Sequence, residues 1–449
     1  MQKAKKYIFT ILAVSLLASL AYSFYFHSKP VVDAKKYDEV GWNLAQGFGY
    51  VTNPEHTPLR DYSIFMVGPG YQFFLAGVYA LFGHHLGIVW ALQALLLAAA
   101  GYLTFLISRE LFKKNWHPAI GIIAGACVAL APDLIMTSGM ILADVLGVFL
   151  LTLSVWLAFR YEAEPRLTVL LALSLVLGYA VMVRSVLLLL VPLCLVVFFV
   201  KRRWLDAILF LVVLIVMFTP WTVRNYKTFD KFIPFNLAGH IDFWIGNHSG
   251  ATGELEEVPE MTKFFNEMDA PRVAEISLAR GKEFIFTHPL QAASLVVKRA
   301  SIYASFIRPV GWWPYPGPRG YSIDAVRGVS LALSALYSML LFTLGIAGAI
   351  HAFRAFTKKH ERAKLWFFTI ATVMMPLGIL WLFVESRYRF PIYPFLAIFA
   401  GYFLWTLWQN RHEKQWWKNK ILWAVFGVLL LNSVIDVSLN VARILERIQ

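Results

Sequence analysis

The chain has 449 residues, of which 59% are hydrophobic and 15% charged, with a mean hydropathy of +0.60 and a formal net charge of +14. A soluble domain carries about 25% charged residues, so this composition argues against a soluble globular protein. Cys127 and Cys194 both lie in apolar runs, which argues against a disulfide framework or a thiolate metal site. The basic residues cluster in short loops, as topology determinants do, and no nucleic-acid-binding motif accompanies them.

The chain begins with lysines and then an apolar run from Tyr7 to Phe26. This run is long for a signal peptide, which favours an uncleaved first span with a cytoplasmic N-terminus. Residues 27–85 then form the first outer loop. Within it we expect a short interfacial helix at Val40–Gln46, ended by glycines, and a second one at Tyr71–Phe82.

Further apolar runs follow, each long enough or nearly long enough to cross a hydrocarbon core of about 30 Å. With the first run they predict an all-α polytopic membrane protein with about 11 transmembrane helices, outer-face loops and juxtamembrane helices. The expected spans are Leu86–Ile107, Pro118–Ala131, Ile141–Phe159, Leu167–Val183, Val186–Val200, Leu205–Thr219, Val329–Ile350, Leu365–Val384, Phe390–Trp408 and Ile421–Leu439.

Charge is distributed unevenly over the loops. Arginines and lysines gather at residues 160–166, 201–203 and 354–364, whereas the loops between them carry almost no lysine. The positive-inside rule therefore places the basic loops in the cytoplasm and the first outer loop outside. We divide the chain into an N-terminal transmembrane catalytic module (1–220, with the outer loop 27–85), an extracytoplasmic loop region (221–327) and C-terminal transmembrane helices (328–449).

The first outer loop holds a cluster of polar and charged side chains. Asp33, Lys36, Tyr37, Asp38 and Glu39 lie within seven positions of one another. In a chain that is mostly compatible with lipid, such a cluster is costly unless it faces water and has a function. The alternative for Asp33 is a solvated loop charge beside neighbouring lysines.

Asp144 stands near the start of an apolar span and has no local partner in the sequence. Carboxylates inside membrane segments are costly and usually functional. The alternative is a carboxylate that stabilises a helix N-terminus.

Five stretches of the chain resemble, in the same order, motifs of the GT-C membrane glycosyltransferases. The likeness is to the bacterial branch that includes dolichyl-phosphate-mannose protein mannosyltransferases and aminoarabinose transferases. The first stretch is Asp33, Tyr37 and the Asn-Leu-Ala-Gln-Gly-Phe-Gly run that follows. The others are GPGYQFFLAGVYALFG (68–83), LADVLGVFL (142–150), TPWTVRNYKTF (219–229) and ESRYRFPIYP (385–394).

The resemblance implies a GT-C fold and a polyprenyl-phosphate-dependent glycosyltransferase, with Asp33 as the catalytic carboxylate of an inverting transfer and Asp144 as a second acidic site. The chemistry fits, because a lipid phosphate is a good leaving group and the acceptor needs a base on the opposite face. Asp38 and Glu39 are alternatives to Asp33. Tyr37 and Tyr388 are further candidates, beside Asp33 and Arg387 respectively.

The donor phosphate requires cations, and arginine suits phosphate oxygens best. The candidates are Lys36, Arg184, Arg224, Arg387 and Arg389. Alternatively, Arg387 pairs with Glu385 and the other cations anchor lipid headgroups. Asp33 and Asp144 are also the candidate ligands for a divalent cation (Mg²⁺ or Mn²⁺), although members of the superfamily differ in metal dependence and the histidines show no ligand spacing.

The predicted function is sugar transfer from a polyprenyl-phosphate donor to a protein, lipid or glycan acceptor at the extracytoplasmic face of a bacterial inner membrane. The main alternative is a transporter or flippase of a lipid-linked or amphipathic solute, which would place carboxylates near the bilayer midplane. A ligase that moves a whole lipid-linked oligosaccharide shares the expected architecture. The sequence distinguishes neither the sugar nor the acceptor.

Overall fold

The computed structural model describes residues 2–66, 68–256, 258–307, 324–411 and 419–448, and every regular element among them is a helix. The all-α prediction is confirmed for these residues. Part of the predicted loop region, residues 308–323, lies outside the described ranges.

The described residues of the first half of the chain form ten α-helices and three short 3₁₀ helices, which are labelled η. In chain order they are α1 (Gln2–Phe26), α2 (Val32–Ala45), η1 (Tyr62–Phe65), α3 (Gly70–Phe82), α4 (Leu86–Phe112), η2 (Lys113–Asn115), α5 (Pro118–Ala129), α6 (Pro132–Ser138), α7 (Asp144–Ala163), α8 (Leu167–Val183), η3 (Ser185–Leu189), α9 (Leu190–Val200) and α10 (Trp204–Phe229).

The described part of the second half continues with shorter helices and then returns to long apolar ones. These are α11 (Ala238–Gly246), α12 (Pro259–Glu267), α13 (Ala270–Thr287), α14 (Pro289–Ala304), α15 (Asp324–Ala355), α16 (Lys359–Ile379), η5 (Ser386–Ile392), α17 (Tyr393–Gln409) and α18 (Lys420–Ile448). The predicted domain division at residue 220 remains a prediction, and α10 runs continuously across it.

Among the described helices, seven are long and apolar enough to cross a membrane, or eight if the bent pair α5–α6 counts as one span. The expected count of about 11 is therefore not confirmed. Two of the expected spans, in α8 and in η3–α9, are shorter apolar helices, and α16 begins with charged residues that lower its hydropathy. The expected helix at Tyr71–Phe82 is confirmed as α3, one residue longer.

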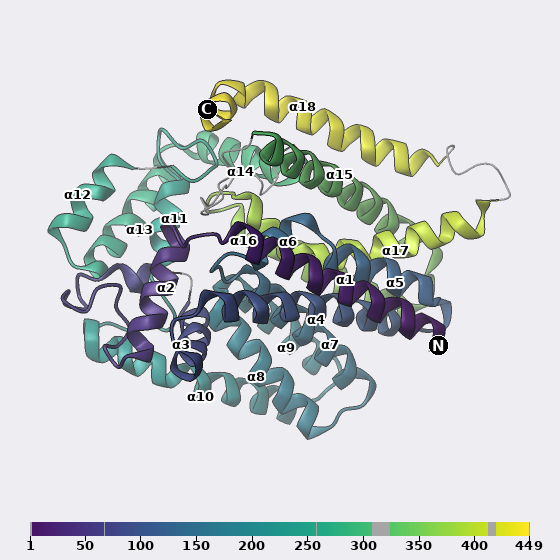
Figure 1. The fold of residues 1–449 in the computed structure, drawn as a ribbon, viewed down its shortest axis with the longest axis horizontal. Helices are drawn as coiled ribbons and strands as arrows, with labels where there is room; N and C mark the ends of the chain where they lie inside the picture. Colours follow the sequence, from purple (N-terminus) through teal and green to yellow (C-terminus); the bar gives the residue numbers. More distant parts are fainter. Residues whose placement is uncertain (1, 67, 257, 308–323, 412–418, 449) are drawn as a thin grey trace.

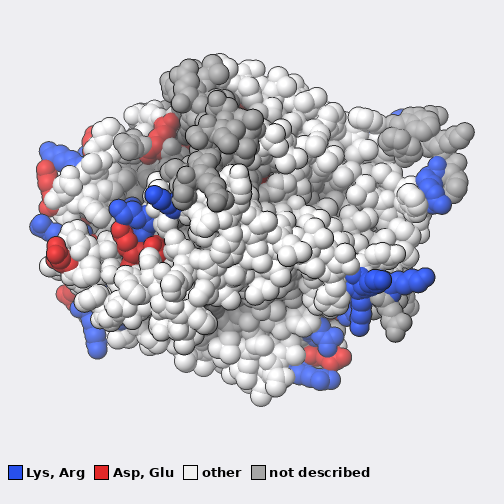
Figure 2. Space-filling view, in the orientation of Figure 1, with Lys and Arg blue, Asp and Glu red and all other residues white. Residues whose placement is uncertain are grey.

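The long helices α1, α4, α5, α15, α17 and α18 run roughly along the longest axis of the molecule, and α2, α11, α12 and α13 gather at one end of it (Figure 1). Figure 2 shows charged side chains mostly toward the two ends of this axis, with a broad band between them that is nearly free of charge. Such a band is what the hydrocarbon core of a bilayer requires of a protein surface.

The segment around Asp33 is helical rather than a loop, which corrects the expectation that the first helix of this region begins at Val40. Helix α2 begins at Val32, after Pro30 and an extended Val31, and Asp33 lies in its first turn. An acidic side chain is favourable there because the exposed N–H groups of a helix N-terminus carry partial positive charge.

Helix α2 packs its buried face against α3. Ala34, Tyr37 and Val40 recur at helical spacing and are buried. At Gly41 the helices approach so closely that a Cβ atom would lie 2.6 Å from the Leu75 Cβ. This packing fixes the direction in which the first turn of α2, and with it Asp33, faces the rest of the bundle.

Candidate active site

Three charged side chains meet at the start of η5, one from α2 and two from η5 and the residue before it. Arg387 donates from Nη2 to Asp33 Oδ2 at 2.7 Å and from Nε to Glu385 Oε2 at 2.6 Å. Asp33 is 37% exposed, whereas Arg387 is 12% and Glu385 4% exposed. The guanidinium therefore joins a buried carboxylate to one that faces the solvent, and charge-assisted bonds of this kind are strong and directional.

A second ion pair lies beside the first. Arg184, at the break between α8 and η3, contacts Asp144 at 2.5 Å, and both side chains are largely buried. Asp144 is the first residue of α7, whose expected start was Ile141. A small cavity of about 30 Å³ is lined by this pair and also by Arg387 and Tyr388, which places the two ion pairs next to each other.

A larger cavity of about 440 Å³ opens at this point, lined by Asp33, Lys36, Tyr37, Arg387 and Tyr388. Its remaining walls combine two further carboxyl groups with aromatic and aliphatic side chains. These include Asp242, Glu385, Phe65, Met66, Ile241, Ile245, Met261, Phe265 and Phe383. The cavity thus combines charged groups of α2 and of η5 with a mainly apolar lining from η1, α11 and α12, in which Asp242, Thr262 and Asn266 are polar.

Two carboxyl groups of the cavity, those of Asp33 and Asp242, have pKa values shifted in opposite directions. Burial alone raises the pKa of Asp33, but the Arg387 guanidinium outweighs it, so that the pKa lies below its ordinary value. Burial, with a smaller contribution from the charges of Glu385 and Asp33, raises the pKa of Asp242 to about 8. At neutral pH, Asp33 is therefore ionised and Asp242 is mostly protonated.

Two buried carboxylate oxygens in this cluster have no hydrogen-bond partner in the described structure: Asp144 Oδ2 and Glu385 Oε1. Buried polar atoms are nearly always satisfied, so these two oxygens are open to a hydrogen-bond donor from water or a ligand. Among the described residues, no group of three or more His, Cys, Asp or Glu side chains forms a metal site. Asp33 and Asp144, the expected metal ligands, each contact an arginine, and the metal remains a prediction.

The other two predicted phosphate ligands lie away from the cavity. Arg224 donates to the Tyr50 carbonyl at 3.2 Å and stacks over Tyr50, Trp221 and Phe229. Arg389 is 1% exposed and donates to the Ile302 carbonyl at 2.9 Å. Neither lines the cavity, and each makes its printed contacts with other parts of the bundle.

The two alternatives to Asp33 also face elsewhere. Asp38 accepts hydrogen bonds from Tyr79 Oη at 2.5 Å and from His84 at 2.9 Å. Glu39 lies 3.7 Å from Lys35 in an exposed pair. Of the three acidic residues on α2, only Asp33 lines the cavity.

Asp242 is a candidate site residue that the sequence reasoning missed. It lies on α11, in the otherwise apolar run Ile-Asp-Phe-Trp-Ile, outside every motif named above. A lone carboxyl in an apolar helix is the same signal that drew attention to Asp144, and it could have identified Asp242 as well. Glu385 was considered only as a partner of Arg387, which it is.

Known proteins resemble this chain in sequence over part of its length and in fold over most of it. Residues 66–223 match the family model of dolichyl-phosphate-mannose-protein mannosyltransferase. A comparison with curated protein sequences found no match.

Among solved structures, the Archaeoglobus fulgidus oligosaccharyltransferase AglB, in complex with an inhibitory peptide and a dolichol-phosphate, matches 96% of this chain at 13% identity and a TM-score of 0.54. The same enzyme in complex with Zn and sulfate matches 94% at a TM-score of 0.53. ArnT from Cupriavidus metallidurans, bound to undecaprenyl phosphate, matches 91% at 16% identity and a TM-score of 0.44. The chain spans about half of the oligosaccharyltransferase, 55% of its length in the first comparison.

The protein is thus an integral, multi-pass membrane protein. Its fold is that of the GT-C membrane glycosyltransferases, and the resemblance drawn from the five motifs is confirmed. Within that superfamily, the family-model match lies with the protein mannosyltransferases over residues 66–223.

Proposed function

We propose that the protein transfers a sugar from a polyprenyl-phosphate donor to an acceptor at the extracytoplasmic face of the membrane, with inversion at the anomeric carbon. The observation that carries this proposal is the cavity of about 440 Å³ in which Asp33 and Arg387 lie together. It combines an ionised carboxylate, the two cations Lys36 and Arg387, and apolar side chains, which are the groups that a lipid-phosphate sugar and its acceptor need.

The reaction has one bond forming and one bond breaking. The acceptor oxygen or nitrogen attacks the anomeric carbon, and the bond from that carbon to the phosphate oxygen breaks with its electrons going to the lipid phosphate. The acceptor proton passes to Asp33. Arg387 holds Asp33 Oδ2, so we assign the proton to Oδ1. The leaving phosphate needs positive charge rather than a proton, because its ordinary form at neutral pH is an anion.

We assign the donor phosphate to Arg387, Lys36 and Arg184. Lys36 and Arg387 line the large cavity, and Arg184 and Arg387 line the small one beside it. Arg387 is central because its fork spans Asp33 and Glu385, and a phosphate would take the place of Glu385 while the bond to Asp33 Oδ2 remains. The polyprenyl chain would follow the apolar lining of the cavity toward the bilayer.

The placement of the charged groups favours an enzyme over the transporter alternative. Asp33 lies in the first turn of a helix outside the candidate spans, and Asp144 and Glu385 lie at the ends of spans. A transporter site is expected near the bilayer midplane instead. The uneven distribution of basic loops supports an extracytoplasmic site, and the bacterial branch that the motifs resemble supports the inner membrane of a bacterium.

The test is turnover by the purified protein in detergent with a panel of polyprenyl-phosphate sugars, read as release of the lipid phosphate. Asp33→Asn is compared with Asp38→Asn, which changes a carboxylate on the same helix that does not line the cavity. We expect release to fall at least about a hundredfold with Asp33→Asn, as for loss of a general base, and to persist with Asp38→Asn. Equal release by wild type and Asp33→Asn contradicts the assignment. If the protein binds the donor but releases no lipid phosphate with any mixture of acceptors, the transporter is favoured.

A further inference from the structure

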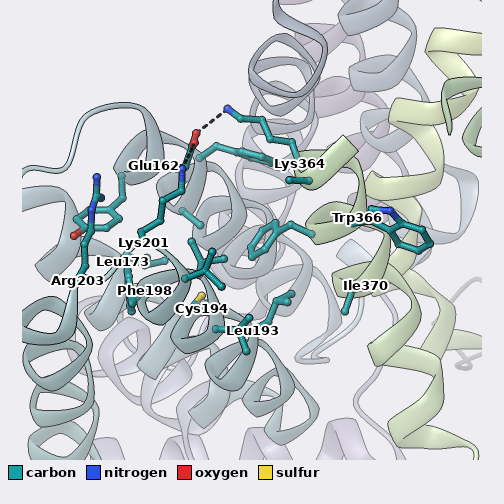
Figure 3. A pocket seen from close by; sticks show the side chains of 18 of the residues that line it. Glu162, Leu173, Leu193, Cys194, Phe198, Lys201, Arg203, Lys364, Trp366 and Ile370 are labelled. Atoms are coloured by element: carbon teal, nitrogen blue, oxygen red, sulfur yellow. Dashed lines mark ion pairs between the residues drawn. The ribbon is translucent and has the colours of Figure 1, made fainter. Parts of the chain in front are cut away.

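A second cavity, of about 350 Å³, lies between α7, α9 and α16 (Figure 3). Its interior is apolar, with Leu173, Leu193, Cys194 and Phe198 on its walls. Four charged side chains labelled in Figure 3, Glu162, Lys201, Arg203 and Lys364, gather at one end of it. We refer to it as the α7–α9–α16 pocket.

The pocket lies at the opposite face of the membrane from the candidate active site. Both sites include residues of α7, Asp144 near its start and Glu162 near its end. At about 1.5 Å per residue, the two side chains attach to the helix axis about 27 Å apart, close to the ~30 Å thickness of a hydrocarbon core. The pocket therefore does not belong to the proposed sugar-transfer site.

The charged end of the pocket has an excess of cations. Glu162 contacts Lys364 at 2.7 Å, His360 at 3.5 Å and Lys201 at 3.6 Å. Arg203 also lines the pocket, stacked over the Tyr161 ring. Three ordinarily cationic side chains and one histidine thus share one carboxylate among the lining residues, which leaves the pocket complementary to an anion.

The pocket opens between α9 and α16 as well as at its charged end. Four of its apolar lining residues, Val196, Val200, Trp366 and Ile370, are between 41% and 75% exposed on the protein surface. They lie on α9 and α16, within the part of the chain that the composition assigns to the bilayer. A lipid chain could enter between these two helices without crossing water.

We propose that the α7–α9–α16 pocket binds one anionic phospholipid of the cytoplasmic leaflet, with an acyl chain in the apolar interior and the phosphate among Lys201, Arg203 and Lys364. The cations come from two separate basic segments, residues 201–203 and 354–364, and the positive-inside rule places such segments at the cytoplasmic surface. Anionic lipids concentrate in that leaflet, and each lysine or arginine near it contributes about 1 kcal/mol of attraction.

The bound phospholipid would contact α7, α9 and α16 at the end of the bundle away from the active site. Glu162 already holds Lys201 and Lys364 from two of these elements. A lipid phosphate would add a second anion to the same cations and relieve their mutual repulsion. Bound lipid should therefore stabilise the bundle against heat.

The test uses the full-length protein, depleted of lipid in detergent, and native mass spectrometry with dioleoyl phosphatidylglycerol or dioleoyl phosphatidylcholine. The wild type should bind the anionic lipid more tightly than the zwitterionic one. Lys201→Gln with Arg203→Gln should weaken phosphatidylglycerol binding about thirtyfold, at about 1 kcal/mol for each charge removed, and leave phosphatidylcholine unchanged. Glu162→Gln should act in the opposite direction and tighten phosphatidylglycerol binding.

Two further variants locate the site. Arg166→Gln removes an exposed cation from a neighbouring loop that does not line the pocket, and it should change nothing. Ala158→Trp fills the apolar interior and should remove phosphatidylglycerol from the complex. Equal affinity for the two lipids in the wild type, or equal weakening by Arg166→Gln and the double change, overturns the proposal. The opposite signs expected for Glu162→Gln and the lysine–arginine change separate binding from misfolding.

Discussion

Asp33 Oδ2 and Arg387 Nη2 lie 2.7 Å apart, although 354 positions separate the two residues in the chain. The pair connects the first turn of α2, near the N-terminal span, to η5, which leads into α17. The ion pair therefore joins the first and last thirds of the chain at the candidate site.

Replacing Arg387 by lysine keeps the charge but removes the fork that reaches Asp33 and Glu385 together. Lysine presents a single nitrogen, so one of the two carboxylates loses its bond. We expect kcat/KM for lipid-phosphate release to fall about a hundredfold, equivalent to about 3 kcal/mol of transition-state stabilisation. Arg224→Lys is the matched control, because Arg224 lies outside the cavity, and it should change kcat/KM less than about threefold. A larger loss with Arg224→Lys contradicts the site as drawn.

Asp144 and Arg184 should behave as a coupled pair. Each is buried, and the two are 2.5 Å apart, so Asp144→Asn or Arg184→Gln alone leaves a buried charge uncompensated at a cost of about 3–5 kcal/mol. The double variant should recover about 1–3 kcal/mol of that stability, measured by heat denaturation in detergent.

Turnover of the same three variants separates a structural pair from a functional one. If Arg184 contacts the donor phosphate, the double variant regains stability but its kcat/KM stays low. Recovery of both stability and turnover in the double variant shows that the pair only holds α7 against the end of α8.

Asp242 should give the reaction a pH dependence above neutrality. Its pKa is raised to about 8, mainly by burial and then by Glu385 and Asp33, so the group is neutral below that pH and ionises above it. Ionisation adds a negative charge to a cavity that binds a phosphate, and the KM for the donor should rise roughly tenfold between pH 7 and pH 9. Asp242→Asn should abolish this rise. Asp269→Asn, which changes an exposed carboxylate near Arg60, should retain it.

The site shows what sequence patterns can and cannot supply. Asp33, Asp144, Arg184 and Arg387 were all selected from the sequence. Asp144 stood out as a carboxylate in an apolar span, Asp33 was chosen chiefly through the motif resemblance, and the arginines were chosen as candidate phosphate ligands. Their pairing was not, because no local pattern says which arginine meets which carboxylate across the bundle. The Arg387–Glu385 contact was expected as an alternative, since only Ser386 separates the two residues in the chain.

Arg387 and Arg389 illustrate the limit most directly. Both precede the same proline and look equivalent as phosphate ligands in the sequence. They lie in a 3₁₀ helix, however, where successive side chains are about 120° apart, so residues two positions apart point in different directions. Arg387 faces the cavity, and Arg389 faces the core and donates to the Ile302 carbonyl. The two arginines would diverge in an α-helix as well, so the spacing predicts that they differ but not which of them faces the cavity.

The last prediction concerns the turn Gly68-Pro69-Gly70, which packs against the end of α8 just before Arg184. At Gly68, φ is +62° and a Cβ atom would lie 1.9 Å from the carbonyl oxygen of Met182, two residues before Arg184. Tyr179 of the same helix end donates to the Gly70 carbonyl at 2.9 Å. Gly68→Ala must therefore displace the end of α8, whereas Gly47→Ala, at φ +83°, meets no atom within 4 Å.

Both substitutions place an alanine at positive φ, at a cost of about 1–2 kcal/mol. Only Gly68→Ala adds an overpacking cost of about 1–3 kcal/mol, so its heat denaturation should occur at a clearly lower temperature. Because the displaced backbone leads directly into Arg184, Gly68→Ala should also lower kcat/KM, and Gly47→Ala should not. Equal losses of stability in the two variants would mean that the turn does not press against α8, and that Arg184 is positioned by its ion pair with Asp144 alone.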